Sequence, residues 1–329
     1  MKKFINQVEL VEDQMIQGMV KAYPQYVRKL ECGNVVVRTE KKEGKVALIS
    51  GGGSGHEPAH GGYVGTGMLD AAVAGAVFTS PTPDQIYEGI KAIATDKGVL
   101  MVIKNYTGDV MNFEMAGEMA QMDEIKVAQV VVDDDVAVDG SLYTVGRRGV
   151  AGTVFVHKIA GAKAEEGAEL EEVQRVAQKV IDNVRTMGVA IRPCTVPAAG
   201  KPGFELGEDE MEVGIGIHGE PGTHKEPLRP ADEIVDHILD KILSDIDYTG
   251  HEVAVMVNSS GATPLMELFI INNHVADVLA EKGIKVYKTF VGEYMTSLEM
   301  EGFSVSLLRL DDEMKALLDA HADTIAFKA

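Results

Sequence analysis

The stretch Ile49-Ser50-Gly51-Gly52-Gly53-Ser54-Gly55-His56-Glu57-Pro58-Ala59-His60-Gly61-Gly62-Tyr63 is the part of the chain around which the rest is organised. It follows the apolar run at residues 45–49, which predicts a short buried strand. The glycine-rich loop is therefore expected at the carboxyl end of that strand, where open α/β sheets bind ligands. Glycine backbone is costly to order, and this loop leaves almost no side chain in the way of a ligand.

The loop matches neither of the familiar phosphate-binding motifs. A P-loop needs a lysine followed by serine or threonine, and no lysine lies between Lys45 and Lys91. A dinucleotide-binding fingerprint fails as well, because the glycine spacing is wrong and Pro58 interrupts the helix that the motif must open. The loop instead offers backbone N–H groups beside the imidazole of His56, which suits a small polar molecule. The alternative is a glycine-rich turn with an incidental histidine.

Composition limits the class of protein. The 329 residues are 45% hydrophobic and 25% charged, which is long enough and apolar enough for two domains. The formal net charge of −20 argues against nucleic acid or an anionic membrane as a partner. The N-terminus has no apolar signal segment and no long apolar run follows, so we expect a cytoplasmic protein. Cys32 and Cys194 lack metal or redox spacing and are predicted to be buried thiols.

Apolar runs alternate with helical patterns, which predicts an α/β fold. We expect two α/β domains, each a mixed or parallel sheet covered by helices, with the substrate site at loops between them. A charged amphipathic helix is predicted over residues 165–187, and the boundary is placed at its end, giving domains 1–186 and 187–329. The helix predicted over residues 110–122 carries four methionines that are expected to fill the core, namely Met111, Met115, Met119 and Met122.

Several polar side chains follow predicted strands. Ser80 lies in the polar loop 79–84, and Lys104 ends the apolar strand 98–103, with Asp109 five residues beyond it. His218 ends the alternating strand 211–217 and is flanked by glycines that clear its ring for access. A lysine and an aspartate at this spacing can direct a cation and a base into one cleft, although an ordinary surface loop fits the spacing equally well.

The run at residues 133–135 has three adjacent carboxylates and suggests magnesium. Consecutive residues at a strand end point to opposite faces, however, so capping and turn formation are preferred and no metal site is assigned. The compact basic group at residues 146–149 is suited to bind a partner's carboxylates or a phosphate, or to pair with those aspartates.

Three chemistries remain for His56, Asp109 and His218. A metal site lacks helical spacing, because Pro58 lies between His56 and His60. A serine triad through Ser54 lacks the nucleophile-elbow motif. The third possibility is one imidazole acting as a nucleophile toward a carbonyl, with the other histidine and the aspartate handling protons.

Five segments carry a resemblance to a known family: residues 51–63, 78–86, 103–109, 216–222 and 261–268. Together they resemble the dihydroxyacetone-binding K subunit of dihydroxyacetone kinases, of the phosphotransferase-system-dependent type. The likeness covers essentially the whole chain, which is therefore also describable as one K-type domain. Its long ordered motifs are far more specific than any single glycine pattern.

The resemblance implies roles for individual residues. His218 would attack the ketone carbon of dihydroxyacetone and form a covalent hemiaminal, which excludes glycerol because it has no carbonyl. Asp109 would take the proton from the hydroxyl to be phosphorylated, and His56 would assist at the oxygen as acid or base. The substrate-binding set implied for the hydroxyls and their surroundings is Gly53, Ser54, Gly55, His56, Ser80, Lys104 and Asp109.

The resemblance also implies partners. The chain itself would carry no cofactor and no metal, since ADP and magnesium belong to an L subunit that is rephosphorylated by a phosphohistidine protein supplied from phosphoenolpyruvate. A stand-alone K chain resembles this form, whereas relatives that use ATP usually have K and L fused. A homodimer is implied too. The alternative is a non-catalytic paralogue that binds dihydroxyacetone and co-activates a transcription regulator, but intact His56, Lys104, Asp109 and His218 favour catalysis.

Overall fold

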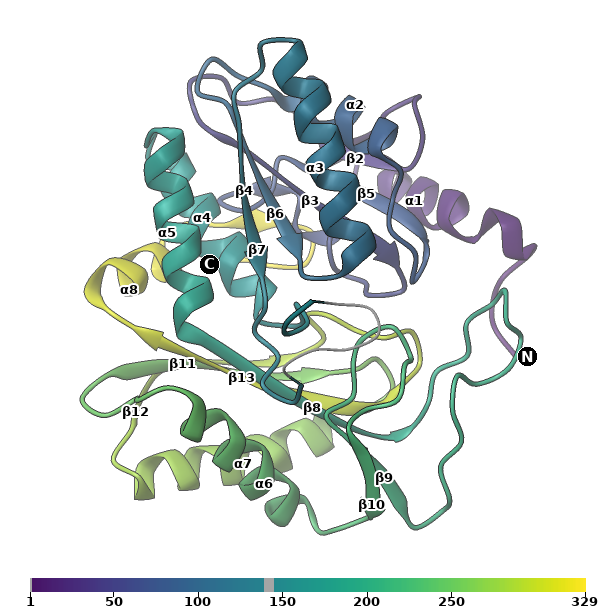
Figure 1. The fold of residues 1–329 in the computed structure, drawn as a ribbon, viewed down its shortest axis with the longest axis vertical. Coiled ribbons are helices and arrows are strands. Elements are labelled where there is room, and N and C mark those ends of the chain that lie inside the picture. The colour runs from purple at the N-terminus through teal and green to yellow at the C-terminus, as the bar shows by residue number, and fades with distance from the viewer. Residues whose placement is uncertain (1, 139–144) are drawn as a thin grey trace.

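The computed structural model describes residues 2–138 and 145–329, and two six-stranded sheets dominate it (Figure 1). The first sheet has the order β1-β2-β5-β3-β6-β7, in which β5, β3, β6 and β7 run parallel. Its strands are β1 (Val27–Lys29), β2 (Val35–Arg38), β3 (Ala47–Ser54), β5 (Ala71–Val77), β6 (Val99–Lys104) and β7 (Val127–Val132). Strands β3 and β6 are buried throughout, as expected for parallel strands covered on both faces.

The second sheet has the order β10-β9-β8-β13-β11-β12 and is antiparallel except for the pairing of β11 with β12. Its strands are β8 (Val184–Arg192), β9 (Glu210–Val213), β10 (His224–Pro227), β11 (Glu252–Ser259), β12 (Lys285–Gly292) and β13 (Glu301–Leu310). Helices α6 (Ala231–Asp245) and α7 (Leu265–Glu281) pack on its outer face and close a separate apolar core (Figure 1). The predicted fold class, two helix-covered α/β sheets, is confirmed.

Helices cover both faces of the first sheet. On one face lie α2 (Pro83–Ile93) and α3 (Thr107–Met122), which close an apolar core with β3, β5 and β6. On the other lie α4 (Thr153–Glu165) and α5 (Leu170–Asn183), and α5 contacts β6 and β7 of the first sheet as well as β13 of the second. Together with α8 (Asp312–Asp319) they form a layer between the sheets, so the largest core cluster draws on both.

The chain ends return to the first sheet. Helix α1 (Val11–Ala22), preceded by the short helix η1 (Val8–Leu10), contacts β1 and β5. Near the C-terminus, β14 (Asp323–Thr324) pairs with β4 (Gly65–Thr66), just after the short helix η2 (Gly61–Tyr63). The first-sheet strands end at Val132 and those of the second begin at Val184; the domain division at 186/187 stays a prediction.

Three sequence-based expectations are wrong. The helix expected over residues 165–187 is α5 alone, because residues from Val184 onward pair with β13 as strand β8. Met111, Met115 and Met122 are exposed instead of filling the core, because the buried side of α3 is supplied by Phe113 and small residues. Cys32 is exposed, while Cys194 is buried as expected. Among residues 2–138 and 145–329, no helix has the length and hydropathy needed to span a bilayer.

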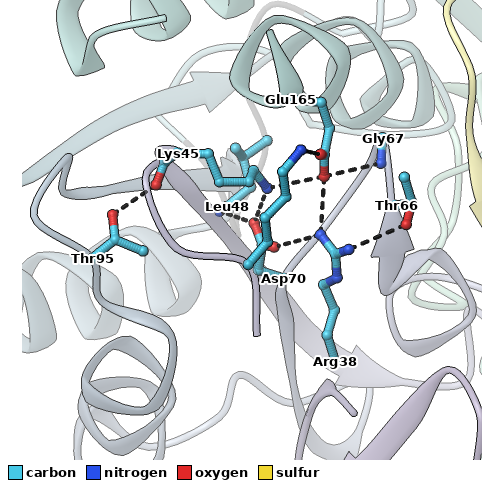
Figure 2. A network of polar contacts seen from close by, with 9 residues as sticks. Arg38, Lys45, Leu48, Thr66, Gly67, Asp70, Thr95 and Glu165 are labelled. Carbon is cyan, nitrogen blue, oxygen red and sulfur yellow. Dashed lines mark hydrogen bonds and ion pairs between the residues drawn. The ribbon is translucent and has the colours of Figure 1, made fainter. Parts of the chain in front are cut away.

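A buried charge network fixes the start of β3 to the end of α4 (Figure 2). The Lys45 ammonium donates to Asp70 Oδ2 at 2.7 Å, and Arg38 bridges Asp70 at 3.1 Å and Glu165 at 2.9 Å. Burial alone would raise the pKa of Glu165, but the attraction of Lys45, Lys42 and Arg38 lowers it to about 2. Each buried charge in this network therefore has a partner of opposite sign, and we name these residues, Arg38, Lys45, Asp70 and Glu165, the paired network.

Candidate active site

A cavity of about 560 Å³ lies where loops of the two sheets meet. Its walls come from the loop after β5, the first turn of α3 and the loop that follows β9. The lining residues are Phe78, Ser80, Tyr106, Thr107, Gly108, Asp109, Gly203, His218, Gly219, Glu220 and Pro221. The carboxyl ends of parallel strands thus face a cavity, as the sequence predicted, and both halves of the chain contribute to it.

The glycine-rich strand β3 supports this cavity from behind. A side chain at Gly53 would bring its Cβ within 2.5 Å of the Thr79 nitrogen and 2.6 Å of Phe78 Cα, so only glycine lets β3 press against the loop that carries Ser80. The Ser54 hydroxyl donates to the Gly75 carbonyl at 2.7 Å, and the Gly55 N–H donates to the Glu57 carboxylate at 3.1 Å. These groups have protein partners here, and their contact with a substrate stays a prediction.

His56 is buried and held in one tautomer. Its Nδ1 lies 2.9 Å from the carbonyl oxygen of Thr296, and because a carbonyl only accepts, Nδ1 carries the proton. Nε2 is then an acceptor, and it is buried without a hydrogen-bond partner among the described residues. Burial, together with the charges of Lys104 and His218, lowers the pKa of His56 well below its usual value. The ring is thus a neutral proton acceptor, stacked on Phe78 with centroids 5.2 Å apart.

His218 stands at the cavity wall among three aromatic rings. Its ring centroid lies 4.3 Å from Tyr106, 4.8 Å from His56 and 5.5 Å from Phe78, each in an edge-on arrangement. Burial, with the cationic Lys104 and Arg148 nearby, lowers the pKa of His218 well below its usual value. His218 is therefore a neutral imidazole, the form that retains a lone pair for attack on a carbonyl carbon.

The loop bearing His218 is anchored by a buried ion network. Glu220 accepts the His218 backbone N–H at 2.8 Å and lies 3.4 Å from Arg148 Nη1. Arg148 in turn donates to Asp135 at 2.7 Å and to the Gly214 carbonyl at 2.7 Å. A Cβ at Gly216 would lie 1.7 Å from Glu220 Oε1, so this glycine makes room for the anchoring carboxylate. The sequence-based interpretation, that it clears the His218 ring, misses this contact.

Lys104 and Asp109 flank Gly52 on the inner side of the cavity. An added Cβ at Gly52 would lie 3.1 Å from Lys104 Nζ and 3.4 Å from Asp109 Oδ2. Both side chains are buried, yet Lys104 Nζ and Asp109 Oδ1 have no hydrogen-bond partner among the described residues. Burial lowers the pKa of Lys104 and raises that of Asp109, in each case opposed by the other's charge, and Ser80 also hydrogen-bonds to Asp109. Buried polar groups are nearly always satisfied, so this pair is suited to contact a polar ligand.

The structure brings together most of the predicted site. Ser80, Asp109 and His218 line the cavity, and His56 and Lys104 lie directly behind the lining. Sequence reasoning gave no role to Tyr106, although its position two residues after Lys104 was a usable signal. It also missed Thr296 and Glu220. Thr296 lies 240 residues from His56, and no local pattern connects them.

Two aspartates of the run at residues 133–135 bind backbone N–H groups, and one of them also binds an arginine. Asp134 accepts the N–H groups of Val150 and Gly152 just before α4, and Asp135 binds Arg148 and the Ala137 N–H. Arg147, the other arginine considered for pairing with these aspartates, pairs with Asp245. Within the described ranges 2–138 and 145–329, no group of three or more histidine, cysteine, aspartate or glutamate side chains is arranged to hold a metal ion.

The chain is an α/β protein with two helix-covered sheets and a cavity between them, and the neutral imidazoles, Lys104 Nζ and Asp109 Oδ1 at this cavity are suited to a small polar molecule. Residues 17–326 match the Dak1 domain family. The chain belongs to that family, which agrees with the resemblance stated from its motifs.

Comparison with individual proteins agrees with this family assignment. The chain is 56% identical over 329 residues to a Listeria innocua protein named PTS-dependent dihydroxyacetone kinase 1, dihydroxyacetone-binding subunit DhaK, covering 99% of this chain and all of that one. It also resembles the crystal structure of the dihydroxyacetone kinase of C. freundii, with 35% identity and a TM-score of 0.93, covering 99% of this chain and 60% of that one. A dihydroxyacetone kinase operon co-activator, Dha-DhaQ, gives 37% identity and a TM-score of 0.89 over 95% of this chain and 97% of that one.

Proposed function

We propose that the protein is the dihydroxyacetone-binding subunit of a phosphoenolpyruvate-dependent dihydroxyacetone kinase, a phosphoenolpyruvate–glycerone phosphotransferase. The observation that carries this proposal is the neutral His218 at the cavity wall, beside the buried Lys104 Nζ and Asp109 Oδ1, which have no hydrogen-bond partner among the described residues. A short ketone with two hydroxyls supplies an electrophilic carbon for the imidazole and polar atoms for the unpaired groups.

Covalent capture follows from the state of the two imidazoles. A ring nitrogen of His218 uses its lone pair to form a bond to the carbonyl carbon, while the C=O π electrons move to oxygen, which takes up a proton. The other ring nitrogen of His218 releases a proton, for which we propose the unprotonated Nε2 of His56 as the acceptor, because the two ring centroids lie 4.8 Å apart. The overall reaction is an addition to the carbonyl group, and its product is a hemiaminal. Glycerol, lacking a carbonyl, is not captured.

Phosphorylation then uses Asp109 as the base for the substrate hydroxyl. Its raised pKa suits a general base better than an ordinary surface aspartate, because proton transfer is most effective when the pKa lies nearer the working pH. Lys104 hydrogen-bonds the substrate oxygens, and Ser80 orients Asp109. Gly53, Ser54 and Gly55 complete the substrate surroundings. Covalent anchoring removes substrate motion and so contributes to lowering the barrier.

The phosphoryl group comes from a partner. We propose that an L subunit carrying ADP and magnesium docks over the cavity and is rephosphorylated by a phosphohistidine protein, with no cofactor on this chain. Helix α3 supports this docking, because its first turn lines the cavity and its exposed face continues as Met111 and Met115, which are 56% and 52% exposed. Methionine is common on adaptable binding surfaces. A homodimer and a cytoplasmic location, without nucleic acid or membrane partners, complete the proposal.

A second candidate function is binding of dihydroxyacetone without phosphoryl transfer. The likeness to the operon co-activator Dha-DhaQ supports a paralogue that binds dihydroxyacetone and acts on a transcription regulator. This candidate predicts the covalent adduct without phosphoryl transfer, whereas the kinase subunit predicts both.

The experiment mixes this protein with a magnesium-ADP-loaded L subunit and the phosphoenolpyruvate-driven donor proteins, with ATP in a parallel reaction. Dihydroxyacetone phosphate should form only with the phosphoenolpyruvate chain and should vanish with His218→Ala. Product from ATP alone would contradict the proposed donor. Adduct without product in either reaction would favour the co-activator.

A further inference from the structure

Residues 294–298 lie in the connection between β12 and β13 of the second sheet and contact the glycine-rich loop of the first. We name them the crossing segment. The Thr296 N–H donates to the His56 carbonyl at 3.2 Å, and the Leu298 N–H donates to the carbonyl of the residue before His56 at 2.7 Å. The Thr296 hydroxyl donates to the Glu57 carbonyl at 2.8 Å. The backbone around His56 is therefore held by a segment 240 residues away in the sequence.

The crossing segment also fixes the state of the His56 ring. The Thr296 carbonyl accepts the Nδ1 proton of His56 at 2.9 Å, which leaves Nε2 unprotonated. The tautomer of a neutral histidine is set by the hydrogen bond that one ring nitrogen makes. A displaced Thr296 carbonyl would make both tautomers accessible, and in one of them Nε2 already carries a proton. The position of this carbonyl therefore controls whether His56 Nε2 can accept the proton of His218.

Asn258, near the carboxyl end of β11, holds the crossing segment in place. Its side chain is 2% exposed. Nδ2 donates to the Met295 carbonyl at 2.8 Å, and Oδ1 accepts the N–H groups of Tyr294 at 2.9 Å and of Met295 at 3.0 Å. Nδ2 also donates to the Ser304 hydroxyl of β13 at 3.2 Å. The amide thus makes hydrogen bonds on both sides to the residue that precedes Thr296.

The chemistry of this contact requires an amide. The two N–H groups only donate and the Met295 carbonyl only accepts, so the facing side chain needs an acceptor and a donor on one planar group. A carboxylate would present oxygen to the Met295 carbonyl. A leucine of similar size would leave all three backbone groups without this partner, at the cost of unsatisfied buried polar groups.

Other contacts hold the crossing segment without Asn258. The Tyr63 hydroxyl donates to the Tyr294 carbonyl, and the Ser297 N–H donates to the Ser260 carbonyl at 2.8 Å. Removing the Asn258 amide should therefore shift the segment without detaching it. A shift is sufficient to alter His56, because reacting groups must be held closely to their productive geometry by the hydrogen bonds of their neighbours.

We propose that Asn258 is a positioning residue for substrate capture, acting through Met295 and Thr296 to keep the proton of His56 on Nδ1. The inference rests on the proposed function, because it concerns the histidine assigned there as the proton acceptor. It adds that a residue of the second sheet controls the protonation state of a histidine on the first. Asn258 does not line the cavity that contains His218, so it acts through the crossing segment and not on the substrate.

The first test is Asn258→Leu in the full chain, which removes the four hydrogen bonds of the amide. Nitrogen-15 NMR of the histidine side chains, without substrate, reads the tautomer of His56, and the His56→Gln variant identifies its signals. The wild type should show a protonated Nδ1 and an unprotonated Nε2, and Asn258→Leu should show both tautomers in exchange. A His56 tautomer unchanged in the folded variant would overturn the proposal.

The second test is the rate of adduct formation with dihydroxyacetone, followed by mass spectrometry. Asn258→Leu should react about 10- to 100-fold more slowly per folded molecule, because a small displacement of a reacting group has effects of this size. Ser304→Ala is the matched control, since it removes one partner of Asn258 and leaves the crossing segment bound. It should leave the rate and the tautomer unchanged. A wild-type rate in Asn258→Leu would contradict the proposal.

A second control separates positioning from stability. Asn183 is another partly buried asparagine, bonded to the Lys179 carbonyl at 2.7 Å and to Arg309 Nε at 2.7 Å. Asn183→Leu should lower the free energy of unfolding and leave the His56 tautomer unchanged. An equal change of tautomer in this variant would mean that general loosening moves His56, and would overturn the specific role of Asn258.

Failure of this inference is distinguishable from failure of the proposed function. The absence of an adduct in the wild type would contradict the proposed function. The tautomer measurement needs no substrate, so it still decides whether Asn258 controls His56.

Discussion

Two buried lysines, at opposite ends of neighbouring parallel strands, have opposite surroundings. Lys45 precedes β3 and is fully paired, with Asp70 at 2.7 Å and Glu165 at 3.4 Å (Figure 2). Lys104 ends β6, and its ammonium group has no hydrogen-bond partner among the described residues. Both side chains are almost completely inaccessible.

The difference separates a structural site from a binding site. A buried charge with complete partners holds secondary structure together, and breaking the pair is costly. A buried charge without hydrogen-bond partners destabilises the ligand-free protein. This cost is offset only when a ligand supplies the missing hydrogen bonds. The charges at the amino ends of the first sheet therefore stabilise the fold, and the carboxyl ends carry the proposed substrate site.

The largest expected effect is on catalysis. Asp109→Asn keeps the size of the side chain and removes the base, so phosphoryl transfer should fall about 10²- to 10⁴-fold. The free energy of unfolding should change by less than about 1 kcal/mol, because no ion pair of normal geometry is lost. Steady-state kinetics and urea unfolding of the same preparation measure both. A stability loss as large as that of a broken ion pair would place Asp109 with the structural charges.

A substitution in the paired network should lower the stability of the fold and leave substrate capture intact. Asp70→Ala leaves Lys45 buried with one distant partner, so unfolding should become easier by about 3–5 kcal/mol. Covalent capture of dihydroxyacetone, measured per folded molecule at low temperature, should be retained. The comparison fails if urea unfolding shows a loss below about 1 kcal/mol.

Removing both unpaired charges sharpens the contrast. Lys104→Met with Asp109→Asn should leave the free energy of unfolding unchanged or raise it by about 1–4 kcal/mol, because two buried charges that offset each other only in part are replaced by groups with a lower desolvation cost. The matched double variant Lys45→Met with Asp70→Asn should be less stable than the wild type, since Arg38 loses its contact with the Asp70 carboxylate and Glu165 loses its contact with Lys45. Thermal and urea unfolding of the two double variants measure these changes in stability. Equal changes in the two variants would contradict the distinction between the paired network and the unpaired charges.

Acid should weaken the paired network selectively. Glu165 has its folded pKa lowered to about 2 from 4.5, so its stabilisation is fully present above about pH 4.5 and is lost as the pH falls toward 2. The difference in unfolding free energy between wild type and Glu165→Gln, about 1–2 kcal/mol at neutral pH after solvent screening, should shrink over that interval. A constant difference would show that ionisation of Glu165 does not contribute.

The smallest expected effect is a near absence of pH dependence in substrate capture. Because the pKa values of His56 and His218 are lowered well below 6.5, both rings stay neutral as the pH falls from about 7.5 to about 5.5. Adduct formation per folded molecule should be nearly constant over this range. A steep loss near pH 6.5 would mean that His218 titrates like an exposed histidine.

The sequence predicted those site residues whose position depends on where a strand ends. Lys104, Asp109 and Ser80 follow apolar runs, and carboxyl ends of parallel strands must meet. Prediction from the sequence failed where contacts between distant segments determine the secondary structure or the buried face of a helix. Helix α4 was missed because it is buried on almost all sides and shows no clear helical period, and β8 begins at Val184 because pairing with β13 overrides the local helical pattern. Likewise, the exposed methionines of α3 have the spacing of core residues, and only the position of the helix shows which side faces solvent.

The most direct test of the account is native mass spectrometry of the protein incubated with dihydroxyacetone, with glycerol as control. We expect one covalently bound dihydroxyacetone per chain, no adduct with glycerol, no adduct in His218→Ala and a weaker adduct in Lys104→Met. An adduct that persists in His218→Ala, or its absence from the wild type, would contradict the claim that the unpaired end of the first sheet exists to hold a carbonyl substrate on His218.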